Sequence, residues 1–242
     1  MAKKIVVASG KGGVGKSTCV VGLAVALCNL NKKVLMIDMD VSLASLDVIF
    51  GVSSQVFNNW GDVVLGRCSV KEAMIEKNGV SLLSAPRTAD DRFSSEKIKE
   101  MIASLDNDFD YILIDSPAGI GQFFEIAVKC ADRGIVVSNA DDVCVRSAGI
   151  AAARMRELGL EDIRLIINKM IVKFSLKRKN LNIDNVIDRT LVRLIGVIPY
   201  NEKIGLISME NRELLLKKEP MKSFERIARR ILGEEVELKI WY

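Results

Sequence analysis

The sequence predicts an α/β fold with a mostly parallel sheet of about seven or eight strands and helices on both faces. Three observations predict it. Short β-branched apolar runs recur along the chain, helical stretches separate them, and a glycine-rich loop joins the first run to the first helical stretch. Because the 242 residues contain only four prolines and no linker rich in proline or glycine, we expect one domain over residues 1–242.

The expected strands lack strict alternation of polar and apolar residues, which is typical of strands buried on both faces. They lie at residues 4–8, 33–37, 111–114, 134–137, 163–167 and 194–198, with a weaker candidate at 81–84. Helical periodicity predicts helices near residues 16–30, 95–105, 122–132, 144–158, 183–191 and 220–232. Ligands of such sheets bind beyond the carboxyl ends of the strands, so we expect the functional side chains to lie there.

The loop after the first strand matches the phosphate-binding pattern G-x-x-x-x-G-K-[ST] over residues 10–17. Its glycines let backbone amides turn towards phosphate oxygens, and the following helix adds partial positive charge. Lys16 is expected to reach the β- and γ-phosphates, and the Ser17 hydroxyl to ligate Mg²⁺. The nucleotide-binding residues are therefore Gly12, Gly13, Val14, Gly15, Lys16, Ser17 and Thr18. We predict a P-loop NTPase that uses Mg²⁺ and ATP.

Two expected strands end in carboxylates that would complete such a site. Asp115 ends one strand, and Asp38 and Asp40 end another. A spacing of two residues places both side chains on one side of an extended chain. One carboxylate can then hold the metal shell while the other orients the attacking water. The alternative for each is a helix cap or a solvated loop acid.

A second lysine, Lys11, lies five residues before Lys16 at the start of the loop. Both lysines are not expected to point at the same phosphate from the same side. If two subunits met across their nucleotides, Lys11 could neutralise charge on the partner's phosphate, as an arginine finger does. The alternative is an exposed lysine in a flexible loop.

The charge balance, the cysteine content and the lengths of the apolar runs disfavour several other classes of function. The excess of 35 basic over 31 acidic residues is too mild to indicate nucleic-acid binding by itself. The five cysteines have no C-x-x-C spacing and the chain has no histidine, which disfavours a zinc or iron–sulfur site within one chain. Unclustered thiols suit a reduced, cytoplasmic protein. No run is long and apolar enough for a signal peptide or a membrane span.

These motifs resemble the ParA/MinD family of deviant Walker A ATPases, and within it the MinD branch most closely. Residues 11–18 resemble the deviant Walker A motif, and residues 115–120 (Asp-Ser-Pro-Ala-Gly-Ile) resemble Walker B. Asp38-Met39-Asp40, followed by Leu43, Leu46 and Asp47, resembles the first switch segment. The likeness extends over about residues 1–237.

The resemblance implies an ATP-dependent sandwich dimer in which Lys11 is the signature lysine, with slow hydrolysis that a partner accelerates. It implies that Asp40 positions water, that Asp38 and Asp115 hold the magnesium shell, and that Asn168 and Pro199 lie near the adenine. It also implies a role in placing the division septum, with a division inhibitor and a regulator protein as partners. The expected location is the cytoplasm, with peripheral contact at the inner face of the membrane.

The chain departs from the family where partner contacts are expected. The family's arginine and asparagine after Asp40 are replaced by Ala44 and Ser45, and a glutamate is replaced by Gly121. Family members commonly end in a basic amphipathic helix, whereas Val236, Leu238 and Ile240 alternate with charges as in a strand. Residues 220–232 have one apolar and one basic face, which could bind a membrane weakly but more simply packs on the domain.

Two alternatives remain open. The first is a positioning ATPase of another kind, a ParA-like partitioner on DNA or a flagellar-number regulator. The second is a nucleotide-dependent metal carrier that holds an iron–sulfur cluster between subunits, for which Cys130 and Cys144 are candidates. A bacterial tyrosine kinase is disfavoured because Tyr242 is the only tyrosine near the C-terminus.

Overall fold

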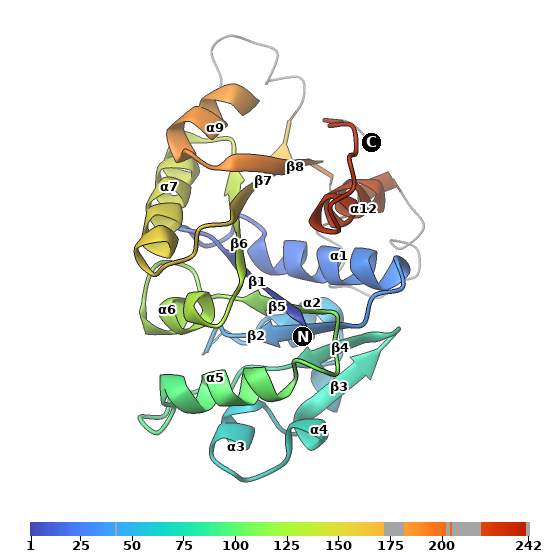
Figure 1. Cartoon of the computed structure of the whole chain (residues 1–242), viewed down its shortest axis with the longest axis vertical. Helices are drawn as coiled ribbons and strands as arrows, with labels where there is room; N and C mark the ends of the chain where they lie inside the picture. The colour runs from blue at the N-terminus through green and yellow to red at the C-terminus, as the bar shows by residue number, and fades with distance from the viewer. Residues whose placement is uncertain (42, 172–181, 202–203, 205–218, 241–242) are drawn as a thin grey trace.

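The computed structural model describes residues 1–41, 43–171, 182–201, 204 and 219–240 (Figure 1). In these ranges the strands form one eight-stranded sheet in the order β3-β4-β2-β5-β1-β6-β7-β8. All neighbours are parallel except the antiparallel pair β3–β4. The strands are β1 (Lys3–Ala8), β2 (Val34–Asp38), β3 (Met74–Lys77), β4 (Val80–Leu83), β5 (Tyr111–Asp115), β6 (Arg133–Asn139), β7 (Ile163–Met170) and β8 (Arg193–Pro199).

Helices cover both faces of the sheet, as Figure 1 shows, with α1 and α12 on one side and α5, α6, α7 and α9 on the other. The helices are α1 (Lys16–Asn29), α2 (Leu46–Phe50), the 3₁₀ turn η1 (Ser53–Gln55), α3 (Trp60–Val64), α4 (Val70–Ala73), α5 (Ser95–Ser104), α6 (Gln122–Lys129), α7 (Asp142–Glu157), α9 (Ile183–Thr190) and α12 (Glu219–Ile231).

Successive residues of the central strand β1 bury opposite faces of the sheet. Ile5 and Val7 pack in the cluster that contains α1 and α12, and Val6 and Ala8 pack in the cluster under α5, α6 and α7. Two buried faces explain why the strands are apolar without alternation. The predicted fold class, a mostly parallel sheet with helices on both faces, is confirmed.

Strand β3 and the short helices α2, α3 and α4 were not predicted from the sequence. The turn between β3 and β4 is Asn78-Gly79, with φ of 51° and 75°. An Asn-Gly pair with two positive φ angles is a favoured hairpin turn, so the sequence did contain a signal for this hairpin.

The amphipathic stretch at 220–232 packs on the domain. Phe224 and Ile227 are buried, and their rings and methyl groups lie against Gly22 of α1 and Gly196 of β8. The prediction of a strand from the alternation at residues 236–240 is wrong, because these residues form no strand. The Arg230 guanidinium instead donates a hydrogen bond to the Val236 carbonyl oxygen at 2.7 Å and holds this segment against α12. Within the described ranges, no helix has the length and apolarity needed to cross a membrane.

Candidate nucleotide-binding site

A pocket of about 540 Å³ opens at the carboxyl ends of the strands, where the fold places ligands. The glycine-rich loop forms one wall of this pocket, and Asp40 comes from the segment after β2. Asn168 and Pro199, at the ends of β7 and β8, line it as well. Candidate residues from four separate segments, of which Asn168 and Pro199 were expected from the family resemblance alone, therefore surround one cavity.

The shape of the loop depends on its glycines. Gly13 and Gly15 have φ angles of 79° and 92°, which side chains rarely adopt. A Cβ atom on Gly15 would lie 2.3 Å from the side-chain nitrogen of Asn168. That nitrogen donates a hydrogen bond to the carbonyl oxygen of Val14 at 2.8 Å. Asn168 thus holds the loop by a direct hydrogen bond.

Lys16 is buried at the start of α1, beneath the loop. Its ammonium group lies 2.5 Å from Oδ1 of Asp115 and 3.4 Å from the Ser17 hydroxyl. The other carboxylate oxygen of Asp115, Oδ2, is buried and has no hydrogen-bond partner among the described residues. An unsatisfied buried carboxylate oxygen is costly unless a cation or its water shell satisfies it, so the donor set fits a hydrated Mg²⁺.

Asp38 lies directly beside Asp115 in the register of β2 and β5. Its two carboxylate oxygens accept hydrogen bonds from the backbone amides of Asp40, at 2.9 Å, and Leu46, at 3.0 Å. Burial, together with the neighbouring charge of Asp115, raises the pKa of Asp38 to about 7. The structure therefore brings two buried carboxylates side by side, and a divalent cation would offset their repulsion.

Asp40 differs from Asp38 because it is only half-buried and lines the pocket. Burial raises its pKa above the ordinary value, while the charge of Lys16 opposes the shift. A carboxylate that reaches into the pocket can contact water beside a bound phosphate. The geometry therefore separates Asp40 from the more deeply buried Asp38.

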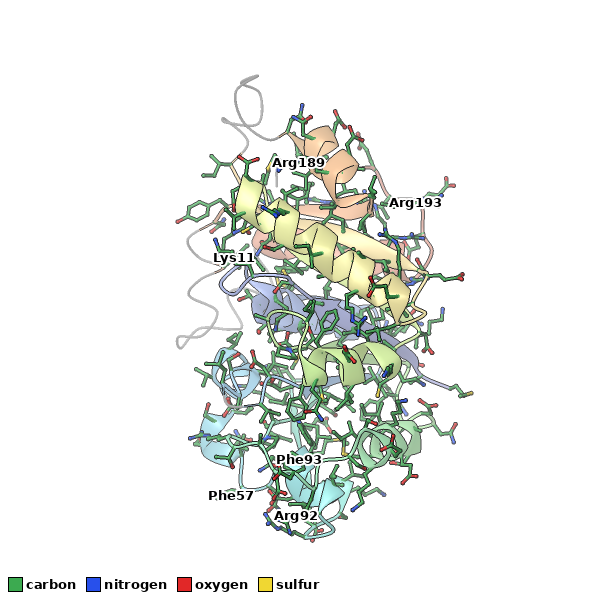
Figure 2. All side chains as sticks on the ribbon, turned by 90° about the vertical axis from the view of Figure 1, so that its left-hand side faces the viewer. Lys11, Phe57, Arg92, Phe93, Arg189 and Arg193 are labelled. Carbon is green, nitrogen blue, oxygen red and sulfur yellow. The ribbon has the colours of Figure 1, made fainter. Side chains whose placement is uncertain are left out.

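Lys11 is exposed on the loop between β1 and α1 and does not line the pocket (Figure 2). Its charge acts on Asp141, just before α7. Burial raises the Asp141 pKa, but hydrogen bonds from Cys144 and the charge of Lys11 lower it by more. The two lysines therefore lie in different environments. Lys16 is buried at the floor of the pocket, whereas Lys11 is exposed on the outer surface.

Lys169, which lines the pocket beside Asn168, was not predicted from the sequence. Its ammonium group donates a hydrogen bond to the carbonyl oxygen of Gly13 at 2.8 Å. Its φ of 53° is unusual for a residue with a side chain, and a register shift between β7 and β8 occurs there. Strained backbone is common at binding sites. Only its position after Asn168 could have drawn attention to it.

The thiols considered for an iron–sulfur site are both buried. Cys130 packs in the cluster under α5, α6 and α7, and Cys144 packs in the cluster on the opposite face of the sheet. Burial raises the pKa of Cys130 to about 11 and also raises that of Cys144. Among the residues that the structure describes, no three histidine, cysteine or acidic side chains are grouped to hold a metal ion.

The fold and this pocket define a P-loop nucleotide-binding protein of the deviant Walker A class. A family model described as an AAA domain matches residues 2–157. The septum site-determining protein MinD of Bacillus subtilis (strain 168) is 34% identical over 248 residues, which cover 99% of this chain and 92% of that protein. The chain therefore belongs to the MinD family of ATPases, as its motifs predicted.

Solved structures agree with this assignment. The structure titled MinC:MinD cell division protein complex from Aquifex aeolicus superposes with a TM-score of 0.91 at 31% identity, with 100% of both chains covered. MinD from Pyrococcus horikoshii, solved with Mg-ADP, gives a TM-score of 0.82 at 26% identity, with 96% of each chain covered.

Proposed function

We propose that this chain binds Mg²⁺ and ATP in the pocket, hydrolyses the nucleotide slowly and acts as a switch in placing the division septum. The observation that carries the proposal is the Lys16–Asp115 ion pair under a glycine-rich loop, with Asp40 at the same pocket. The whole chain, residues 1–242, is proposed to act as one ATPase domain.

The phosphates are assigned to the loop, where backbone amides and the N-terminus of α1 attract anions. Ser17, Asp38 and Asp115 are proposed to hold Mg²⁺, which would neutralise charge on the phosphates when bound. Asp40 would accept a hydrogen bond from the attacking water and orient it. Asn168 and Pro199, which line the same pocket, would contact the adenine.

Dimerisation is proposed to depend on Lys11. Because Lys11 is exposed and outside the lining of the pocket, it is not placed to neutralise phosphates bound by its own chain. A partner subunit that faces the pocket would bring its Lys11 to the nucleotide. Leu43, which is 74% exposed at the pocket mouth, would become buried in such a dimer.

The proposed partners follow from the relatives. The Aquifex aeolicus protein is titled as a complex of MinC with MinD, so a MinC-type division inhibitor is proposed to bind this chain. An ATPase-activating regulator is proposed as the second partner. The protein would act in the cytoplasm and touch the membrane peripherally and weakly.

The test compares ATP binding and ATP turnover in wild type and Asp40→Ala. We expect the variant to bind a fluorescent ATP analogue with wild-type affinity and to lose at least about 100-fold in turnover, because the residue that orients water is missing. Asp108→Ala, which changes an exposed acid near β5, is the control and should leave both quantities unchanged. Equal turnover in Asp40→Ala and wild type would contradict the assignment.

A further inference from the structure

Trp60 connects the candidate metal site to the helix α3. Its side chain is fully buried, and its indole Nε1 donates a hydrogen bond to the backbone carbonyl oxygen of Asp38 at 2.7 Å. Its own backbone amide donates to the carbonyl oxygen of Ser84 at 3.0 Å. A capping box made by Asn59 and Asp62 fixes the first turn of this helix.

The peptide group between Asp38 and Met39 is therefore held at both of its polar atoms. The carbonyl oxygen accepts from Trp60, and the Met39 amide donates to the backbone carbonyl oxygen of Asp115 at 2.8 Å. This peptide directly follows one candidate magnesium carboxylate and is bonded to the residue that carries the other. Rotation of this peptide would move the Asp38 carboxylate relative to Asp115.

Two phenylalanine rings pack against the indole. The ring centroid of Trp60 lies 5.0 Å from that of Phe93 and 6.1 Å from that of Phe123, both tilted by 57°. Phe123 is in the first turn of α6, which follows the Walker B-like segment. Figure 2 shows Phe93 in the lower part of the molecule. The indole thus joins the segment after β2 to the segment after β5.

We propose that Trp60 is a positioning residue that sets the Asp38 carboxylate for Mg²⁺ through the hydrogen bond to the Asp38 carbonyl oxygen. This inference rests on the proposed function, because it assumes that Asp38 belongs to the magnesium shell. Trp60 itself does not line the pocket. It acts by preventing the Asp38–Met39 peptide from turning, so that both carboxylates face the same position.

The test measures the Mg²⁺ concentration that gives half-maximal ATP turnover in the full chain. Trp60→Phe keeps an aromatic ring but removes the donor, and we expect the half-saturating Mg²⁺ concentration to rise about five-fold, the effect of one buried hydrogen bond. ATP-analogue affinity in the presence of EDTA should stay within about two-fold of wild type, because the phosphate loop is unchanged. Phe93→Leu is the matched control, since it disturbs the same packing and keeps the indole donor.

The proposal is overturned if Trp60→Phe has the Mg²⁺ dependence of wild type, or if Phe93→Leu shifts it equally. Should Trp60→Phe not fold, β-(3-benzothienyl)alanine at position 60 replaces the indole N–H by sulfur at nearly the same volume, with the same outcomes expected. Asp38→Asn separates the two proposals. If it leaves the Mg²⁺ dependence unchanged, the proposed magnesium site is wrong; if it shifts the dependence and the Trp60 variants do not, only the positioning role is wrong.

Discussion

The ammonium group of Lys16 lies 2.5 Å from Oδ1 of Asp115, and both side chains are almost completely buried. The lysine that the loop motif assigns to phosphate is therefore paired with the strand-end carboxylate assigned to magnesium. A bound phosphate would compete with Asp115 for Lys16, while Mg²⁺ would satisfy the carboxylate that Lys16 leaves. Nucleotide and metal are expected to bind cooperatively for this reason.

Removing one partner of this pair should destabilise the protein. Lys16→Met leaves Asp115 buried without its cation, and we expect the free energy of unfolding in the absence of nucleotide to fall by about 3 kcal/mol. The double variant Lys16→Met/Asp115→Asn should recover most of that loss, because neither position then carries a charge that lacks its partner. Urea unfolding measures both values. A double variant as unstable as the single one would show that the ion pair is not the cause.

The loop glycines should differ in tolerance. Gly15→Ala introduces a Cβ atom 2.3 Å from the Asn168 side chain at a φ of 92°, so we expect loss of ATP-analogue binding by at least about 30-fold. Gly12→Ala is the control, because nothing lies within 4 Å of its Cβ position. It should keep a well-ordered loop and lose much less affinity. Equal losses in fluorescence titrations would contradict the role of Asn168 in fixing the loop.

Two helical glycines differ in the space around them, and Gly22 tests how α12 packs on α1. Gly22→Ala would place a Cβ atom 2.6 Å from the Phe224 ring, and we expect it to lower the free energy of unfolding by about 2 kcal/mol. At Gly149 of α7 the nearest atom to a Cβ is 3.5 Å away. Gly149→Ala should therefore be neutral or stabilise by up to about 1 kcal/mol through helix propensity. Thermal unfolding of both variants separates the clash from the propensity.

Stability should fall in alkaline solution through Cys130. Burial raises the pKa of this thiol from 9.0 to about 11, so the folded protein keeps a proton that the unfolded chain releases. The contribution is fully present below pH 9 and is lost as the pH rises from 9 towards 11. At pH 10 the loss should be about 1 kcal/mol. In Cys130→Ala, denaturant unfolding between pH 8 and pH 10 should show a smaller loss than in wild type; identical slopes would contradict this.

Much of the fold could be predicted because the parallel strands are continuous apolar runs and the longer helices have a helical period. The parallel strands were placed to within a few residues, and the amphipathic stretch at 220–232 is the helix α12. The short helices α2, α3 and α4 have four or five residues each, too few for a periodic pattern. The alternation at residues 236–240 suggested a strand, but hydrogen bonds from the Arg230 side chain to the Val236 carbonyl oxygen hold this segment instead.

The candidate site shows the same division. Residues in motifs, from Gly12 to Thr18, were identified because their chemistry requires a fixed spacing. Lys169 contacts Gly13, which is 156 positions away, and Trp60 contacts Asp38, which is 22 positions away. Neither a fixed spacing nor the residue type predicts such contacts. Candidate binding side chains could thus be selected by their motifs, whereas Lys169 and Trp60, which contact the loop and the Asp38 backbone, could not.

The most direct test of the switch is the molecular mass in solution with saturating ATP and Mg²⁺, measured by light scattering. The Asp40→Ala variant, which should retain its nucleotide, is predicted to have twice the 26.7 kDa of one chain. The double variant Asp40→Ala/Lys11→Ala is predicted to remain at the mass of one chain while still binding ATP. A monomeric Asp40→Ala variant, or a double variant that dimerises equally well, would contradict the account.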